Sequence, residues 1–197
     1  MIRRIISVIL LVTMAATLFA GCAGKQEEQV KLSEGDEIVL GSFDGTDLEW
    51  IVVDTDDEGA FLVSKYAVAE MAFNTDIADT SWETCSLRTW LNEDFYNEAF
   101  SSSDKEKIIL SDVGSKVFLL DRDETCTYFP TDESRKVLPL PGSDILTFKE
   151  HCYWWLRTSG CGARHALYVH DVGIIDDYGF SVYNPHCCVR PAIWIKN

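Results

Sequence analysis

Two stretches near the end of the chain decide the fold: Tyr153-Trp154-Trp155-Leu156-Arg157-Thr158-Ser159-Gly160 and Val189-Arg190-Pro191-Ala192-Ile193-Trp194-Ile195. Between them, short apolar or alternating runs at Ala166–Val169, Gly173–Ile175 and Phe180–Tyr183 are separated by turn residues. Runs of this length, rich in aromatic and β-branched residues, predict consecutive strands. Because aromatic side chains bury a large area each, we expect this segment to supply the core sheet.

Three further strands are predicted near the other end, at Glu37–Phe43, Leu48–Asp54 and Ala60–Ser64. Clusters of Asp and Gly separate them, at 44–47 and at 56–59, and such clusters are typical of hairpin turns. The pattern predicts a three-stranded meander.

The middle of the chain changes to a helical period between Trp82 and Phe100. Apolar residues recur there at intervals of three and four, which predicts one helix capped by Thr84 or Ser86; they are Leu87, Trp90, Leu91, Phe95 and Ala99. The sequence Ser103-Asp104-Lys105-Glu106 has the form of a capping box and predicts a second, short helix. After an apolar run at Val117–Leu120, the polar stretch from Asp121 to Phe148 reads as a long irregular loop.

These elements predict an α+β domain in which two helices pack on a twisted antiparallel sheet. Before it, residues 1–21 combine a basic start with an apolar run, as in a secretory signal. The run ends in Leu18-Phe19-Ala20-Gly21-Cys22, which resembles a bacterial lipobox, although Phe19 stands where leucine is usual. We expect lipidation at Cys22, a tether over 22–35 and a domain over 36–197; a plain signal peptide or an uncleaved anchor is the alternative.

The predicted location is therefore the cell membrane, with the protein anchored by lipid and facing outside the cytoplasm. The formal net charge of −15 argues against a nucleic-acid partner. Loss of the leader removes Arg3 and Arg4 and no acidic residue, so the mature chain is more acidic still. No cofactor is expected, since the chain has no phosphate loop, no nucleophile elbow and no His-Glu-x-x-His motif.

Five motifs in one order resemble a family of bacterial extracytoplasmic domains known only as a domain of unknown function. They are Trp82 to Asn92, Phe95 to Phe100, Val117 to Leu120, Trp154 to Arg157 and Val189 to Ala192, and the resemblance spans about Ile38 to Ile195. The closing pattern is also similar to the C-type-lectin-like fold, which sulfatase-modifying enzymes and several surface binding proteins share. The Glu-Pro-Asn and Trp-Asn-Asp motifs of calcium-dependent sugar binding are absent, so that activity is not implied.

The likeness to lectin-like folds implies a ligand face in the C-terminal stretch. Aromatic and acidic side chains gather in it, a combination that suits sugar or peptide recognition; they are Tyr168, Asp171, Asp176, Asp177, Tyr178 and Tyr183. Strand packing and turn formation are the alternative roles.

Three arginines lie in apolar surroundings: Arg88, Arg157 and Arg190. A buried guanidinium requires a partner, and for Arg157 and Arg190 we expect Asp121 and Glu124 to supply it. Substrate binding is the alternative role of these arginines. We predict structural ion pairs here.

Six cysteines follow Cys22, and outside the cytoplasm most of them are expected to be oxidised. The predicted disulfide joins Cys161 to Cys187 or Cys188. The alternative is a soft-metal site that combines these cysteines with His165, His170 and His186.

The function expected from these features is a non-catalytic module that binds an extracellular glycan, peptide or protein. The alternative is a metal- or thiol-dependent enzyme of the sulfatase-modifying type.

Overall fold

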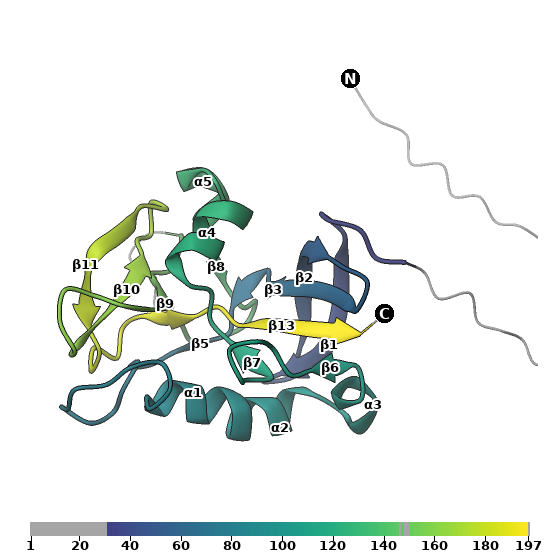
Figure 1. Ribbon diagram of the computed structural model, residues 1–197, viewed down its shortest axis with the longest axis horizontal. Coiled ribbons are helices and arrows are strands. Elements are labelled where there is room, and N and C mark those ends of the chain that lie inside the picture. Colours follow the sequence, from purple (N-terminus) through teal and green to yellow (C-terminus); the bar gives the residue numbers. More distant parts are fainter. Residues whose placement is uncertain (1–30, 146, 148–149, 197) are drawn as a thin grey trace, which may run out of the picture.

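The computed structural model describes residues 31–145, 147 and 150–196. This part of the chain is a mixed α+β structure in which strands predominate and helices are short, with two larger sheets lying side by side (Figure 1). The predicted leader, Cys22 and the first part of the tether lie outside the described residues. The α+β class predicted from the sequence is confirmed.

The first sheet is antiparallel and contains both ends of the described chain. In the described residues its strand order is β1 (Glu37–Phe43), β2 (Thr46–Thr55), β3 (Gly59–Ser64), β13 (Ala192–Lys196) and β6 (Ile108–Ile109), and β7 (Val117–Phe118) also pairs with β13. The predicted meander is confirmed as β1, β2 and β3. Asp44 and Gly45 both have positive φ, 49° and 75°, which is what a two-residue hairpin turn of the primed type requires.

The second sheet has the order β11 (Ile175–Ser181), β10 (His165–Val169), β9 (Trp154–Ser159), β12 (Cys188–Val189) and β5 (Ala69–Glu70). Its pairs are antiparallel except for β9 with β12, which are parallel. A small parallel pair joins β4 (Tyr66–Ala67) to β8 (Leu138–Pro139). Of the predicted strands, Gly173–Ile175 is mostly a turn, because Gly173 N–H donates to the His170 carbonyl.

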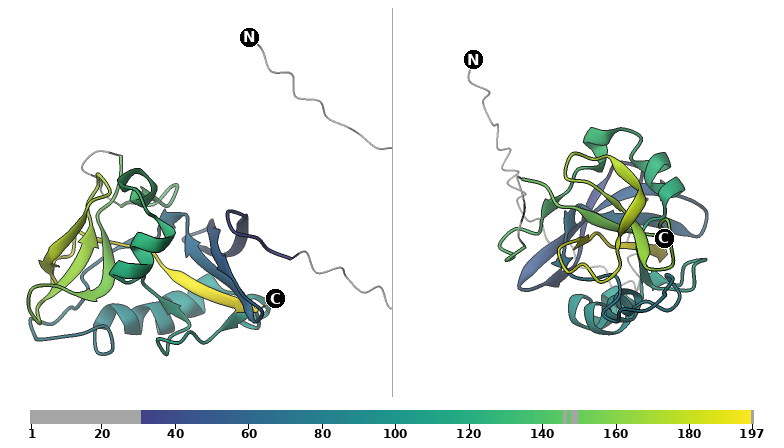
Figure 2. Two further views of the ribbon diagram at one scale, coloured as in Figure 1. Left: turned by 45° about the horizontal axis from the view of Figure 1, so that its top comes forward. Right: turned by 90° about the vertical axis from the view of Figure 1, so that its left-hand side faces the viewer.

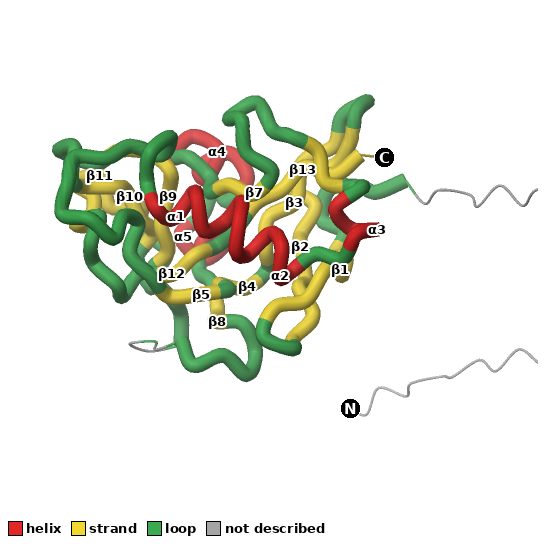
Figure 3. Tube along the Cα trace, turned by 90° about the horizontal axis from the view of Figure 1, so that it is seen from below, coloured by secondary structure: helices red, strands yellow, loops and turns green. Residues whose placement is uncertain are grey.

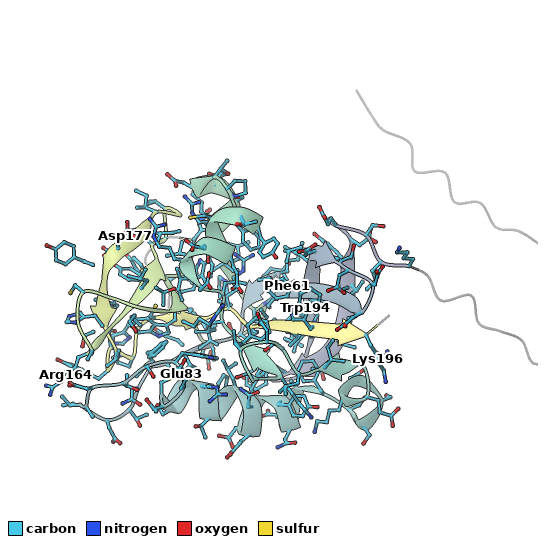
Figure 4. The ribbon with its side chains drawn as sticks, viewed as in Figure 1. Phe61, Glu83, Arg164, Asp177, Trp194 and Lys196 are labelled. Atoms are coloured by element: carbon cyan, nitrogen blue, oxygen red, sulfur yellow. The ribbon has the colours of Figure 1, made fainter. Side chains whose placement is uncertain are left out.

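The two sheets are joined by segments that cross from one to the other. The closing motif pairs through β12 in the second sheet and, after Arg190-Pro191, through β13 in the first. β13 therefore runs through the middle of the molecule, as both views of Figure 2 show in yellow. Trp194 on β13 stacks on Phe61 of β3, with ring centroids 5.0 Å apart (Figure 4).

The predicted long helix is present and lies across one side of both sheets (Figure 3). It consists of α1 (Ser86–Trp90), the π-helical segment η1 (Leu91–Phe95) and α2 (Tyr96–Ala99). Its apolar stripe is buried at Leu87, Leu91 and Phe95. The predicted cap was wrong: the Cys85 thiol, not Thr84 or Ser86, accepts a hydrogen bond from Arg88 N–H at 3.4 Å.

Short helices account for the other differences from the sequence prediction. The second helix, α3 (Ser102–Lys105), has Ser101 as its N-cap, two residues before the predicted cap at Ser103. Ser101 and Asp104 form the capping box. The stretch from Asp121 onward, predicted to be irregular, contains α4 (Arg122–Tyr128) and α5 (Asp132–Arg135). Each begins with a reciprocal capping box, which satisfies the free N–H groups of the first turn.

Candidate functional site

An aromatic pocket with a volume of about 820 Å³ lies on the second sheet. This size is within the range of small-molecule binding sites. The residues that line it come from segments far apart in the sequence, and we call them together the aromatic pocket: Glu70, Thr147, Tyr153, Tyr168, His170, Phe180, Asn184 and His186.

Strand register explains why these residues meet. Tyr168 on β10 pairs with Trp155 on β9 and Asp176 on β11, and its neighbours Leu167 and Val169 turn to the buried face. Tyr153 precedes β9, while β5 presents Glu70 beside Cys188 of β12. The pocket therefore depends on pairing between segments that lie far apart in the sequence.

Three half-buried aromatic rings form one wall. The Tyr168 ring centroid lies 5.1 Å from that of Phe180 and 6.0 Å from that of Tyr153. The imidazole of His170 meets the Tyr153 ring edge-on at 4.5 Å. Since the rings fix one another, their exposed parts form a preorganised apolar surface.

Polar groups surround this wall. His186 Nδ1 lies 3.1 Å from Glu70 Oε1, and the Tyr168 hydroxyl donates to Asp176 Oδ2 at 3.3 Å. Burial, and then the charge of Asp176, raises the pKa of Tyr168 to about 12. Burial, and then Asp171, raises the pKa of Tyr153 as well. Both phenols are therefore neutral at physiological pH.

Most of the predicted ligand-face residues lie outside the pocket lining. Of that set, only Tyr168 lines the pocket. Asp176 accepts hydrogen bonds from Tyr178 and Gly179 N–H and so shapes the turn in β11. Asp177 forms a surface ion pair with Arg122 at 2.7 Å (Figure 4).

The remaining members of that set point elsewhere. Tyr178 is 77% exposed and Tyr183 is 46% exposed, and neither lines the pocket. Asp171 is buried against His170 and lines a different hollow beside Lys136. Tyr153 and Phe180 were interpreted as strand residues from the sequence, and nothing near Glu70 in the sequence marked it as a site residue.

A second, polar hollow of about 480 Å³ lies between the start of α1 and β9. Arg157 pairs there with Asp121 at 2.8 Å and with Glu124. Burial opposes the charge on Arg157, but the hydrogen bond and charge of Glu124, with Asp121, outweigh it and raise the pKa of the guanidinium. These contacts hold α4 against β9.

The other two arginines differ from the prediction. Arg88 donates to Ser115 Oγ and to the Gly114 carbonyl, both at 2.8 Å, so its partners are neutral. Arg190 does not meet Asp121 or Glu124, because β12 directs it into the core between the rings of Phe129 and Trp154. Its centroid distances to those rings are 4.4 and 5.1 Å, and its Nε donates to the Ser64 carbonyl. Burial lowers the pKa of Arg190 to about 9.

The six cysteines in the described residues are free thiols, so the predicted bond from Cys161 to Cys187 or Cys188 is not formed here. Cys161 is exposed in the turn after β9, where its N–H donates to the Tyr178 carbonyl, while Cys187 and Cys188 are buried at β12. Burial raises the pKa of Cys187. A hydrogen bond with Cys152, and then burial, raises that of Cys188. Protonated thiols are poor nucleophiles.

The alternative metal set is not assembled. Within residues 31–145, 147 and 150–196, no group of three His, Cys, Asp or Glu side chains is placed to hold a metal ion. His170 and His186 line the aromatic pocket, whereas His165 begins β10 and its buried Nδ1 has no hydrogen-bond partner there.

Among the helices of the described segment, none combines the length and apolarity needed to cross a bilayer.

Comparison with known proteins finds no match to a curated protein and none to a solved structure. A family model described as a domain of unknown function, DUF6273, matches residues 57–197. Strands β1 and β2 precede that match but pair within the same sheet as β3. With more than half of its length covered by this match, the chain belongs to the DUF6273 family.

Proposed function

We propose that this protein is a non-catalytic binding module, anchored outside the cytoplasm by lipid at Cys22, that holds an extracellular glycan, peptide or protein segment in the aromatic pocket. The observation that carries the proposal is the wall of Tyr153, Tyr168 and Phe180 with polar groups at its edge. Its proposed partner besides the ligand is the membrane, reached through the lipid attached to Cys22.

Of these ligands, a glycan fits the pocket best. A sugar ring offers a flat C–H face that packs on aromatic rings and hydroxyl groups that bond to imidazole, carboxylate and amide groups. Such groups stand beside the wall in His186, Glu70 and Asn184. We also propose a C-type-lectin-like arrangement of the domain; this is supported by the sheet that holds both β1 and β13 and by the helix packed across it.

The full chain, solubilised in detergent, is tested on glycan and peptide arrays. Tyr168→Ala is expected to weaken binding by about tenfold or more, because it removes the central ring of the wall. Tyr178→Ala is the matched control, since this exposed tyrosine lies on the neighbouring strand and outside the lining. If only peptides bind on the arrays, the ligand of the aromatic pocket is a peptide and not a glycan.

Equal loss in both variants, or none in either, would place the binding surface elsewhere. Copper or zinc bound at one ion per chain, or an activity abolished by thiol blocking, would favour the alternative enzyme of the sulfatase-modifying type. Lipid anchoring has its own test: Cys22→Ser is expected to lose both labelled palmitate and membrane association.

A further inference from the structure

Two buried cysteines, Cys152 and Cys188, lie on neighbouring segments of the second sheet. Cys188 on β12 pairs with Trp154 on β9, and its N–H donates to the Tyr153 carbonyl at 2.7 Å. This register places Cys152, two residues before Trp154, diagonally across from Cys188. The neighbouring Cys152 thiol, together with burial, raises the pKa of Cys188. Each of the two residues is 2% exposed.

We propose that Cys152 and Cys188 form a disulfide in the mature protein. Both thiols lose their protons and together give up two electrons as the Sγ–Sγ bond forms. The electrons reduce the disulfide of an oxidising thiol–disulfide exchange partner, which leaves as two thiols. This pair differs from the one expected from the sequence: Cys188 is joined to Cys152 and not to Cys161.

The other cysteines are placed differently. Cys126 and Cys161 are exposed, and the Cys85 thiol donates to the Trp82 carbonyl while it caps α1. Cys187 is adjacent to Cys188 in an extended segment, where neighbouring side chains point to opposite faces. Its carbonyl accepts from Met71 N–H, which fixes that segment against β5.

Burial determines when the bond forms. Once β12 is packed, the oxidant does not reach either sulfur and the thiols stay protonated, so exchange is slow. The bond therefore forms while the chain folds in an oxidising compartment. It joins the residue before Tyr153 to the segment that follows His186, and thereby fixes two sides of the aromatic pocket, whether or not a glycan binds there.

The test is made on the full chain, denatured, refolded in detergent with reduced and oxidised glutathione, alkylated and digested with trypsin without reduction. The expected product is a linked pair of peptides, 150–157 and 165–196, that separates on reduction. Trypsin leaves Cys187 and Cys188 in one peptide, so a matched pair of variants assigns the sulfur. Cys187→Ser is expected to keep the link and Cys188→Ser to lose it.

A second measurement needs no substitution. The oxidised wild-type chain is expected to melt on the order of 5–10 °C above the reduced chain, because the bond closes a long loop in the unfolded state. Cys126→Ser, an exposed control, should leave this difference unchanged. A link that persists in Cys188→Ser, a link through Cys161, or natively folded wild type with both thiols alkylated would overturn the proposal.

Discussion

The two sheets differ in how their faces are covered. In the first sheet, all six residues of β3 are buried, because the helix of α1 and α2 covers one face and α4 the other (Figure 1). Trp50 packs on Phe100 at the end of the long helix, while Phe61 packs on Tyr128 of α4. In the second sheet, β11 has no fully buried residue. The difference teaches that β3 is covered on both faces, whereas the second sheet is buried at β9 and β12 and presents a half-open aromatic face at β10 and β11.

The largest effect is expected from Phe61→Ala, compared with Phe180→Ala. Phe61 is 2% exposed and stacks between Phe118 and Trp194, so its loss leaves a cavity and should cost about 3–5 kcal/mol of unfolding free energy. Phe180 is half-buried on the pocket wall, and its loss should cost about half as much. Urea denaturation followed by tryptophan fluorescence measures both. Equal costs would mean that the pocket wall is packed as tightly as the two-sided core around β3.

The second prediction concerns Gly173, in the turn between β10 and β11 that contacts α5. Gly173 has a φ of 88°, and a Cβ atom there would lie 1.7 Å from the Asp132 carbonyl oxygen. Gly173→Ala should therefore cost about 2–4 kcal/mol, since the backbone must move and the bond from Arg135 Nε to the Gly173 carbonyl is strained. Gly142→Ala, with a similar φ but open space, is the control. Hydrogen exchange should locate the loss in β10 and β11; protection lost first in β1 to β3 would contradict it.

The strands of the first sheet were easier to predict from the sequence than the short helices. Alternation and apolar runs predict β1, β2, β3 and β13 because most buried residues in these strands are apolar. The helices α4 and α5 escaped prediction since their buried residues include Thr125 and Arg135, which make no apolar stripe.

The pocket escaped prediction for a different reason. Glu70 reaches it only through the pairing of β5 with β12, and no local pattern encodes that contact. The ligand face predicted from the sequence included Tyr168, which does line the pocket. It also included Asp176 and Asp177, which instead form a turn and an ion pair.

Alkaline pH tests the packing of the long helix, because the buried Cys85 thiol at the start of α1 should lose its proton there. Burial raises the pKa of the Cys85 thiol from its usual value of 9.0 to about 11. The folded state therefore holds this proton more tightly, and the stabilisation is complete below pH 9 and is lost as pH rises from 9 to 11. Cys85 alone should account for about 2–3 kcal/mol of the loss in the wild type.

Cys85→Ser keeps an oxygen to cap α1 but removes this titration, so its stability should fall less steeply over the same interval. Cys126→Ser, at an exposed position, should follow the wild type. Urea denaturation at a series of pH values between 8 and 11 measures both slopes. Identical slopes for Cys85→Ser and wild type would assign the alkaline loss to other groups.

The smallest effect is expected from Tyr168→Phe, which separates the ring of the pocket wall from its hydroxyl. The ring contacts with Phe180 and Tyr153 remain, and only the bond to Asp176 at 3.3 Å is lost. A single neutral donor to a carboxylate that also accepts two backbone N–H groups should contribute about 0.5–1 kcal/mol to stability. Because the wall is intact, ligand affinity should stay within a few-fold of wild type, whereas Tyr168→Ala weakens it by about tenfold or more. If the phenylalanine variant binds as poorly as the alanine variant, the hydroxyl rather than the ring makes the decisive contact, and recognition by an aromatic wall is wrong.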